Sequence, residues 1–167
     1  LDFTGISGEF AIFNNSGTLQ KTTDSTVVVE AFINSESGLI DVQQGTLELT
    51  GGDYTNSDFQ IANDAVLQFT SGTNTLNSTN TLSGEGTTRI TFGTLTTAEN
   101  STTQINTNQF ELTRGALVTD GVTTITGNTD WTGGRLGGTA ALVNHGQFSI
   151  TDAKFKTLSA GTFTNAS

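Results

Sequence analysis

Short runs of alternating apolar and polar residues, separated by Gly or Asn, fill most of this 167-residue chain. Clear examples are FINSESGLIDVQQGTLELTGG (32–52), YTNSDFQIANDAVLQFTSG (54–72) and VNHGQFSITDAKFKTLSAGTF (143–163). Alternation with a period of two is the signature of a half-buried strand, and no apolar stripe with the 3.6-residue period of a helix appears. The pattern therefore predicts many short strands and no helix.

Turns centred on Asn recur about every twenty residues, at Asn15, Asn34, Asn56, Asn144 and Asn165. A fixed period of this size is typical of a repeat architecture in which successive coils stack on one another. A β-sandwich or an up-and-down barrel is the alternative, but its hairpin turns would not produce such a register. We therefore predict an all-β, single-stranded parallel β-helix (a β-solenoid) over residues 1–167, with roughly eight coils of about 20–22 residues.

Each turn is followed by apolar pairs at positions i and i+2, which share one face of a strand. The pairs are Ile40/Val42 and Leu47/Leu49, then Phe59/Ile61 and Leu67/Phe69, then Phe148/Ile150 and Ala153/Phe155. One coil cannot bury such a face alone, whereas stacked coils join the faces into a continuous apolar interior. The middle of the chain, 73–139, is less regular but alternates in the same way.

Composition agrees with this fold and narrows the chemistry. Hydrophobic residues make up 33% of the chain and charged residues 13%, and the abundant Thr, Gly, Asn and Ser favour strands and turns. Disorder is the alternative for a chain with so little charge, but eleven regularly placed Phe argue against it. The chain has no Pro, which suits continuous hydrogen-bonded ladders, and no Cys, which excludes disulfides and thiol chemistry.

The net charge of -10, with only six basic residues, argues against nucleic acid or an anionic membrane as the partner. The apolar runs are all too short to cross a bilayer as a helix, so we expect no membrane-spanning helix. The sequence opens in mid-pattern at LDFTGISGEF and closes in mid-pattern at GTFTNAS. We therefore expect a segment of a longer repetitive protein or a mature product.

Several segments share a degenerate motif: NNSGTLQ, NSESGLIDV, GTLELTGG, TNSDFQI, WTGGRL and VNHGQFSI. This motif resembles the repeats of large secreted bacterial proteins, the filamentous-haemagglutinin-like and autotransporter-like passenger domains. The resemblance implies a right-handed parallel β-helix that is extracellular, on the bacterial cell surface, and serves adhesion. It offers no catalytic residue to transfer.

Two kinds of polar residue recur often enough to be candidate sites. The turn residues Asn15, Asn34, Asn56, Asn144 and Asn165 could face a ligand. We favour a structural ladder in which Asn tolerates left-handed backbone and its amides hydrogen-bond from coil to coil. Thr-x-Thr pairs on a flat face could bind ice if they lie in register on successive coils, although outward Thr is also ordinary strand chemistry. The pairs are Thr73/Thr75, Thr79/Thr81, Thr94/Thr96 and Thr124/Thr126.

The acidic residues lie mostly at predicted turns. Asp53 and Asp58, with a carboxylate from a neighbouring coil, are weak candidates for a Ca²⁺ site, which needs six to eight converging oxygens. The glycine-rich nonapeptide of calcium-binding β-rolls is absent, and turn chemistry explains these residues as well. We therefore expect no cofactor, with Ca²⁺ as the alternative.

A parallel β-helix can also host polysaccharide lyases, whose clefts need paired carboxylates or a basic residue near the substrate. Arg114 and Arg135 are separated by about one coil and could stack on neighbouring coils, whereas isolated surface cations are the alternative. His145 is the only His and occupies a turn, which nearly excludes a triad or a His-based metal site. Trp131 is the candidate platform for a sugar ring, and Tyr54 is expected in the core. We predict a chain without enzymatic activity.

The function predicted from the sequence is a non-catalytic, extracellular structural or adhesive β-solenoid of a bacterial surface protein. Its expected partners are further solenoid coils, from flanking repeats or from end-to-end stacking of copies, and a polysaccharide or host cell surface. The alternatives are a polysaccharide-binding module, a polysaccharide lyase and an ice-binding solenoid. Asn14, Asn77, Asn100 and Asn165 stand in N-x-S/T sequons and would be glycan acceptors in a source that glycosylates secreted proteins.

Overall fold

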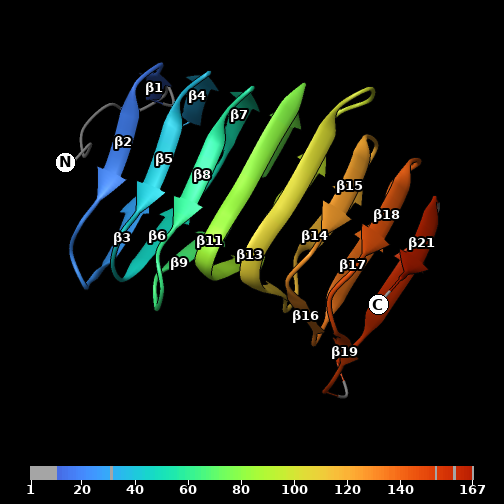
Figure 1. Cartoon of the computed structure of the whole chain (residues 1–167). Coiled ribbons are helices and arrows are strands. Elements are labelled where there is room, and N and C mark those ends of the chain that lie inside the picture. Colours follow the sequence, from blue (N-terminus) through green and yellow to red (C-terminus); the bar gives the residue numbers. More distant parts are fainter. Residues whose placement is uncertain (1–10, 31, 153, 160, 167) are drawn as a thin grey trace.

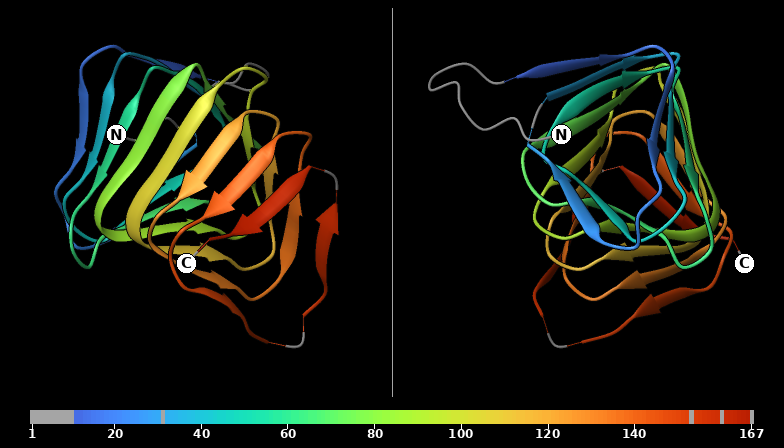
Figure 2. Two further views of the ribbon diagram at one scale, coloured as in Figure 1. Left: turned by 45° about the vertical axis from the view of Figure 1, so that its right-hand side comes forward. Right: turned by 90° about the vertical axis from the view of Figure 1, so that its left-hand side faces the viewer.

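The computed structural model describes residues 11–30, 32–152, 154–159 and 161–166, so the opening LDFTGISGEF lies outside the described residues. Within the described part the chain forms short parallel strands and no helix, and it winds into a three-sided β-solenoid (Figures 1 and 2). The solenoid has about seven turns. The predicted fold class, a single-stranded parallel β-helix, is confirmed.

Each full turn of the solenoid supplies one strand, or part of a long strand, to each of three faces. Face 1 is an eight-stranded sheet: β1 (Ile12–Asn15), β4 (Phe32–Glu36), β7 (Gly52–Thr55), β10 (Thr73–Asn77), β12 (Thr94–Thr97), β14 (Ala116–Thr119), β17 (Gly134–Gly137) and β20 (Lys156–Ser159). Face 2 holds β2 (Thr18–Lys21), β5 (Leu39–Val42), β8 (Asp58–Ile61), the start of β11 (Thr79–Ile90), the start of β13 (Thr102–Leu112), β15 (Val122–Ile125), β18 (Ala141–Asn144) and β21 (Thr162–Asn165). Face 3 holds β3 (Thr26–Val29), β6 (Thr46–Leu49), β9 (Val66–Phe69), the ends of β11 and β13, β16 (Asn128–Trp131) and β19 (Phe148–Ile150).

The strand pairing is parallel throughout the described residues, as stacking of successive coils requires. Ile33 pairs with Gly52 in a short coil, whereas Thr79 pairs with Thr102 across a longer one, so the coils vary in length around the predicted period. With neighbouring strands about 4.8 Å apart, eight strands on face 1 give a body roughly 35 Å long. Extra residues in the longer coils are accommodated at the corners.

β11 and β13 are long because each continues round the corner from face 2 to face 3. Their pairing shifts register between Gly84 and Thr87, where the strand bends. Gly84 has a φ of +117°, and a Cβ there would lie 2.0 Å from the carbonyl oxygen of Ile61 in the preceding coil. Only glycine suits this bend, because a side chain would meet both backbone strain and a fixed backbone atom.

The interior is lined by one column of apolar side chains after another. One column on face 2 runs Leu19, Ile40, Phe59, Leu82, Ile105 and Ile125, and one on face 3 runs Val29, Leu49, Phe69, Ile90, Leu112 and Trp131. Most members of these columns are fully buried. The predicted inward pairs Ile40/Val42, Leu47/Leu49, Phe59/Ile61 and Leu67/Phe69 are therefore confirmed as core.

The last coil departs from the prediction. Ile150 is 64% exposed, and Phe155 lies between β19 and β20 with 86% of its surface exposed, so it is not an inward strand residue. The segment around Phe155 turns the corner from face 3 to face 1 rather than continuing the alternation. Ala153, its expected partner, lies outside the described residues.

The corner between face 3 and face 1 carries the most regular motif of the chain. A Thr-x-Gly triplet occupies it in five successive coils: 50–52, 70–72, 91–93, 113–115 and 132–134. Four of the five Thr hydroxyls donate a hydrogen bond to a carbonyl oxygen of the preceding coil, over 3.0–3.4 Å, in the pairs Thr50–Val29, Thr70–Leu49, Thr91–Phe69 and Thr113–Ile90. These hydroxyls give the carbonyl at the end of each strand a second polar contact.

The glycine of each triplet allows the coils to approach closely. A Cβ on Gly115 would lie 2.2 Å from the carbonyl oxygen of Gly93 one coil away. The register at this corner is fixed by two features, the Thr hydroxyl that bonds to the preceding coil and the Gly that lets the coils approach.

Among the described residues, no helix is long and apolar enough to cross a membrane.

Candidate functional site

Trp131, the candidate sugar platform, does not lie on the surface. It ends β16 with its side chain in the interior column above Leu112, and only 6% of its surface is exposed. Its ring meets Phe148 edge-on, with ring centroids 6.3 Å apart. A sugar ring needs an exposed aromatic face, so this prediction is wrong. Trp131 closes the alternating strand β16, whose alternation points the side chain inward.

The five turn Asn residues do not form one ladder. Asn15 pairs in register with Ser35, and the backbone of Asn34 pairs with Asn14 and Asp53. Asn56 occupies the turn between β7 and β8 with a φ of +50°, the left-handed backbone expected of it. The predicted column through Asn15, Asn34 and Asn56 is therefore wrong, because the corners of the first three coils differ in length.

The end of the chain does contain an Asn stack. Asn144 and Asn165 pair in register, and the Asn144 side-chain amide donates to Oδ1 of Asn165 over 2.9 Å. Oδ1 of Asn144 in turn accepts from the Thr129 hydroxyl over 3.0 Å. For these two residues the structural interpretation of the Asn ladder is confirmed.

A mixed polar column takes the place of the predicted Asn column at the corner between face 1 and face 2. Nδ2 of Asn15 donates to the Ser35 hydroxyl over 3.3 Å, and the Ser57 hydroxyl donates to that of Ser35 over 3.0 Å. Oδ1 of Asn80 accepts from the Ser57 backbone over 3.1 Å. All four side chains are buried and each satisfies a neighbour in the next coil, so the column fixes the stacking of this corner.

Tyr54 lies in the core, as predicted, and is fully buried. Its hydroxyl donates to Oδ1 of Asn74 over 3.2 Å, in the next coil. The ring fills the space beside Gly52, where a Cβ would come within 2.7 Å of the Tyr54 hydroxyl. Burial, helped by the nearby Asp53 charge, raises the pKa of Tyr54 far above its ordinary value of 10.0. The hydroxyl therefore acts as a fixed hydrogen-bond donor.

The carboxylates Asp53 and Asp58 lie on different faces, in β7 and at the start of β8. Among the described residues, no three His, Asp or Glu side chains come close enough to hold a metal ion. Asp58 pairs in register with Thr81, and Asp53 with Thr75, so neither meets an acidic neighbour on the following coil. The third carboxylate that a Ca²⁺ site would need is not brought to them.

Two of the four Thr-x-Thr pairs lie in register. Thr73 and Thr75 in β10 stack on Thr94 and Thr96 in β12. The array ends there, because Ala116 and Val118 follow on one side and Asp53 precedes Thr75 on the other. The remaining pairs lie on or beside face 2, where Thr79 and Thr81 face Thr102 and Gln104.

The arginines are not stacked as expected. Arg135 pairs with Ala116, two positions beyond Arg114, so their spacing along the chain does not bring the two guanidinium groups into one column. Arg114 instead lies over the Phe92 ring, 5.3 Å from its centroid. His145 is an exposed turn residue, as predicted.

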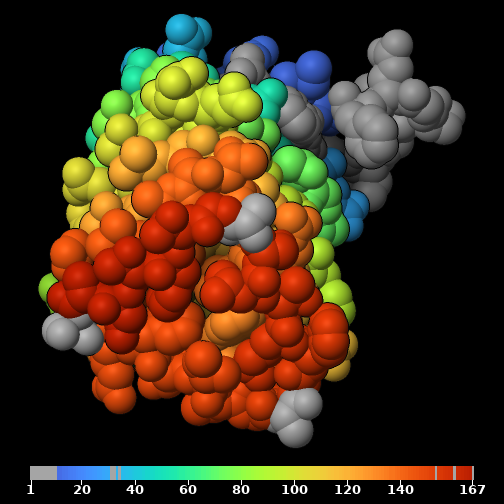
Figure 3. Space-filling model, turned by 90° about the vertical axis from the view of Figure 1, so that its right-hand side faces the viewer, coloured from blue at the N-terminus to red at the C-terminus, as the bar shows by residue number. Residues whose placement is uncertain are grey.

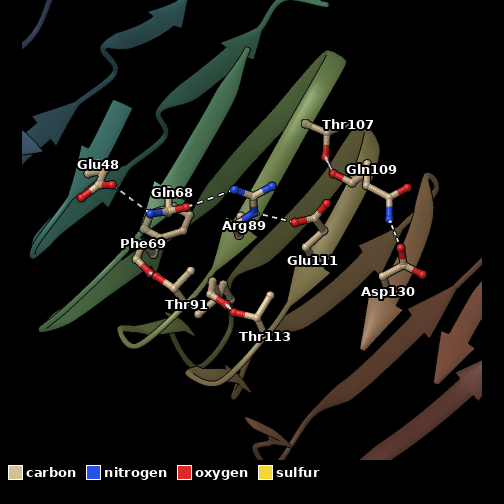
Figure 4. A network of polar contacts seen from close by, with 11 residues as sticks. Glu48, Gln68, Phe69, Arg89, Thr91, Thr107, Gln109, Glu111, Thr113 and Asp130 are labelled. Carbon is tan, nitrogen blue, oxygen red and sulfur yellow. Dashed lines mark hydrogen bonds and ion pairs between the residues drawn. The ribbon is translucent and has the colours of Figure 1, made fainter. Parts of the chain in front are cut away.

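Arg89 belongs to a charged column on the outside of face 3 (Figure 4). Its Nε donates to Glu111 over 2.5 Å, and its Nη1 donates to Oε1 of Gln68 over 3.3 Å. Gln68 donates to Oε1 of Glu48 over 3.0 Å. Side chains from four coils thus join one hydrogen-bonded row that ties these coils together.

The most distinctive lateral surface lies along the corner of the Thr-x-Gly triplets, in the second half of the chain. We name it the corner stripe: Phe92, Arg114, Lys154, Phe155 and Lys156. Three of the six basic residues of the chain belong to it. Phe155 and Phe92 are 86% and 67% exposed, the highest values among the exposed large hydrophobic residues described.

The ends of the described solenoid leave apolar interior uncovered. At the first coil, Phe13, Leu19, Val27 and Val29 line a hollow of about 420 Å³. At the opposite end, Figure 3 shows the last coil surrounding a depression, next to a small space lined by Leu136, Leu142, Leu158 and Phe163.

Comparison with protein-family models, with curated proteins and with solved structures finds no match to this chain.

Proposed function

We propose that this chain is a non-catalytic, extracellular structural or adhesive β-solenoid of a bacterial cell-surface or secreted protein. It provides a stiff rod and a surface for adhesion or for end-to-end assembly. The observation that carries the proposal is the unbroken stacking of coils: face 1 has eight parallel strands, and polar columns tie coil to coil at the corners and on the outer faces. The shape of such a body comes from contacts between neighbouring coils.

Two further features support the proposal. The net charge of -10 makes two copies of the chain repel each other, which opposes association side by side. The apolar interior reaches solvent at Val27 on the first strand of face 3 and at Leu158 on the last strand of face 1. Further coils, whether from flanking sequence or from a second copy, would bury these side chains.

The test measures assembly of the purified chain over a rising concentration series, with and without Ca²⁺, by sedimentation velocity and electron microscopy. Filaments of constant width that disappear in Val27→Lys and Leu158→Lys would establish stacking of coil ends. Val122→Lys is the matched control, because Val122 is an exposed side chain on face 2, away from both ends. If the chain neither assembles nor is retained on cell-wall or host-cell surfaces, the proposal fails.

A further inference from the structure

The corner stripe is a basic and aromatic surface on a strongly acidic protein. We propose that it binds an anionic polysaccharide bearing carboxylates, laid along the axis of the solenoid. This inference goes beyond the structural role and does not depend on it, because the stacking of the coils is the same whether or not one corner binds a glycan.

The stripe is continuous across four successive coils. The Arg114 guanidinium covers the Phe92 ring at 5.3 Å. One coil on, the backbone nitrogen of Gly134 donates to the carbonyl oxygen of Phe155 over 3.1 Å. A Cβ on Gly133 would lie 3.2 Å from Cβ of Lys154. Each coil therefore contacts the next along this corner, and the cations follow the axis of the rod.

The glycines at this corner leave the surface between the cations without projecting side chains. Gly133 and Gly134 occupy the corner in the coil between Arg114 and Lys154, and Arg135 extends its guanidinium along face 1 to Gly137, so no charged side chain stands between the two cations. Coils are about 4.8 Å apart, which places these two positions roughly 10 Å apart along the axis. At one end of the stripe the exposed Phe155 side chain offers an apolar face, the surface against which a sugar ring packs.

The lysines of the stripe contact groups of their own coil. Lys154 pairs with Asp152 over 2.9 Å in an exposed ion pair, and Nζ of Lys156 donates to the carbonyl oxygens of Asp152 and Lys154. Arg135 lies beside the stripe on face 1, where its Nε donates to the Ser159 hydroxyl over 2.9 Å. An exposed pair such as that of Lys154 contributes little and is easily exchanged for a ligand carboxylate. Among the described residues, no carboxylate forms an ion pair with Arg114.

Charge density favours a polysaccharide over other polyanions. A DNA duplex carries one charge about every 1.7 Å, and the net charge of -10 on this protein opposes such a dense partner. An anionic membrane would need a broad basic face, whereas the stripe carries three cations along a single corner. A glycan with one carboxylate on each sugar is sparser, and it is linear like the stripe.

The experiment measures binding of the whole chain to sodium polygalacturonate by biolayer interferometry at low ionic strength. Neutral dextran is the uncharged control, and duplex DNA and phosphatidylserine vesicles are the competing polyanions. We expect binding to polygalacturonate alone, lost in about 0.5 M NaCl because exposed charges are then screened. Binding that is as strong to DNA or to vesicles would overturn the assignment to a polysaccharide.

Variants locate the site. Arg114→Gln should weaken binding about tenfold, and Phe155→Ala should weaken it several-fold. The matched controls are Arg89→Gln, which removes the same charge from face 3, and Val122→Ala, which removes an exposed apolar side chain from face 2; both should bind like the parent. Circular dichroism checks that each variant is folded. Equal loss in Arg89→Gln and Arg114→Gln, or no binding by the parent chain, would overturn the proposal while leaving the rod function standing.

Discussion

Removing the hydroxyl of Tyr54 tests how much the buried polar contacts between coils stabilise the solenoid. Tyr54→Phe deletes the hydrogen bond to Oδ1 of Asn74 and leaves that oxygen in a fully buried place. Nδ2 of Asn74 already lacks a hydrogen-bond partner, so the amide would lose its Tyr54 contact without gaining another. An unsatisfied buried polar group costs about 1–3 kcal/mol, and we expect the free energy of unfolding to fall by this amount.

A substitution at Asn74 separates the effect of the unsatisfied polar group from a general loss of packing. Asn74 pairs in register with Leu95, so a Leu at position 74 continues an apolar column of face 1. The double variant Tyr54→Phe/Asn74→Leu has no stranded polar atom at this place and should be more stable than either single variant. Equilibrium urea unfolding, followed by circular dichroism, measures all four proteins. A double variant whose loss equals the sum of the single losses would refute the reasoning, because coupled partners do not add.

Three further predictions use the single Tyr, the single Trp and two contrasting glycines. Because the pKa of Tyr54 is raised in the folded chain, the contribution of Tyr54 to the free energy of unfolding should be constant below pH about 10 and should fall as the pH rises above it. Phenolate absorbance should appear only as the chain unfolds, and a native chain whose tyrosine titrates near pH 10 would contradict this. Trp131 is buried, so its fluorescence should be blue-shifted and poorly quenched by acrylamide, and quenching at the rate of free indole would contradict its placement. Gly115→Ala should lower the midpoint of urea unfolding, because its Cβ would meet the Gly93 carbonyl oxygen, whereas Gly17→Ala, with open space around it, should not; equal midpoints would contradict the close approach of the coils.

The fold could be predicted because a solenoid imposes one rule on every coil. Inward positions must be apolar and alternate with polar ones, and corners need residues that tolerate turns. Phe59/Ile61 and Leu67/Phe69 show both features within one coil, and their counterparts recur at the same period. Stacking rather than sequence identity holds the coils together, which explains why so loose a repeat still specifies a regular body.

The candidate sites were harder to predict because register depends on corner length. The spacing of the turns suggests that Asn15 stacks on Asn34, but the strands that contain them pair one position further on, Asn15 with Ser35. A slip of one residue moves a side chain to the opposite face of the sheet. The same uncertainty led to a surface position for Trp131, although it ends a strand whose alternation points it inward.

The Thr-x-Gly triplets align the coils in the correct register, whereas the turn Asn residues do not. Five of them occur at nearly equal spacing, from Thr50 to Thr132, and the structure places all five at one corner. Where the middle residue of a triplet has a side chain it is exposed, and this is how Phe92 and Arg114 come to lie on neighbouring coils. Aligning the triplets would have predicted their contact from the sequence alone, whereas the spacing of Arg114 and Arg135 was misleading.

Disulfide trapping tests the stacked register most directly, because the chain has no Cys of its own. Thr75 and Thr96 are paired neighbours on the outside of face 1, and strands about 4.8 Å apart fall within the Cα separation of about 4.4–6.8 Å that a disulfide spans. Thr75→Cys/Thr96→Cys should therefore form an intramolecular disulfide in the native chain, measured by thiol titration and peptide mass spectrometry. Val118 pairs with Thr96 one coil further on, so Thr75→Cys/Val118→Cys, about 10 Å apart, should stay reduced. A free thiol pair in the first variant, or an equally ready disulfide in the second, would contradict the solenoid.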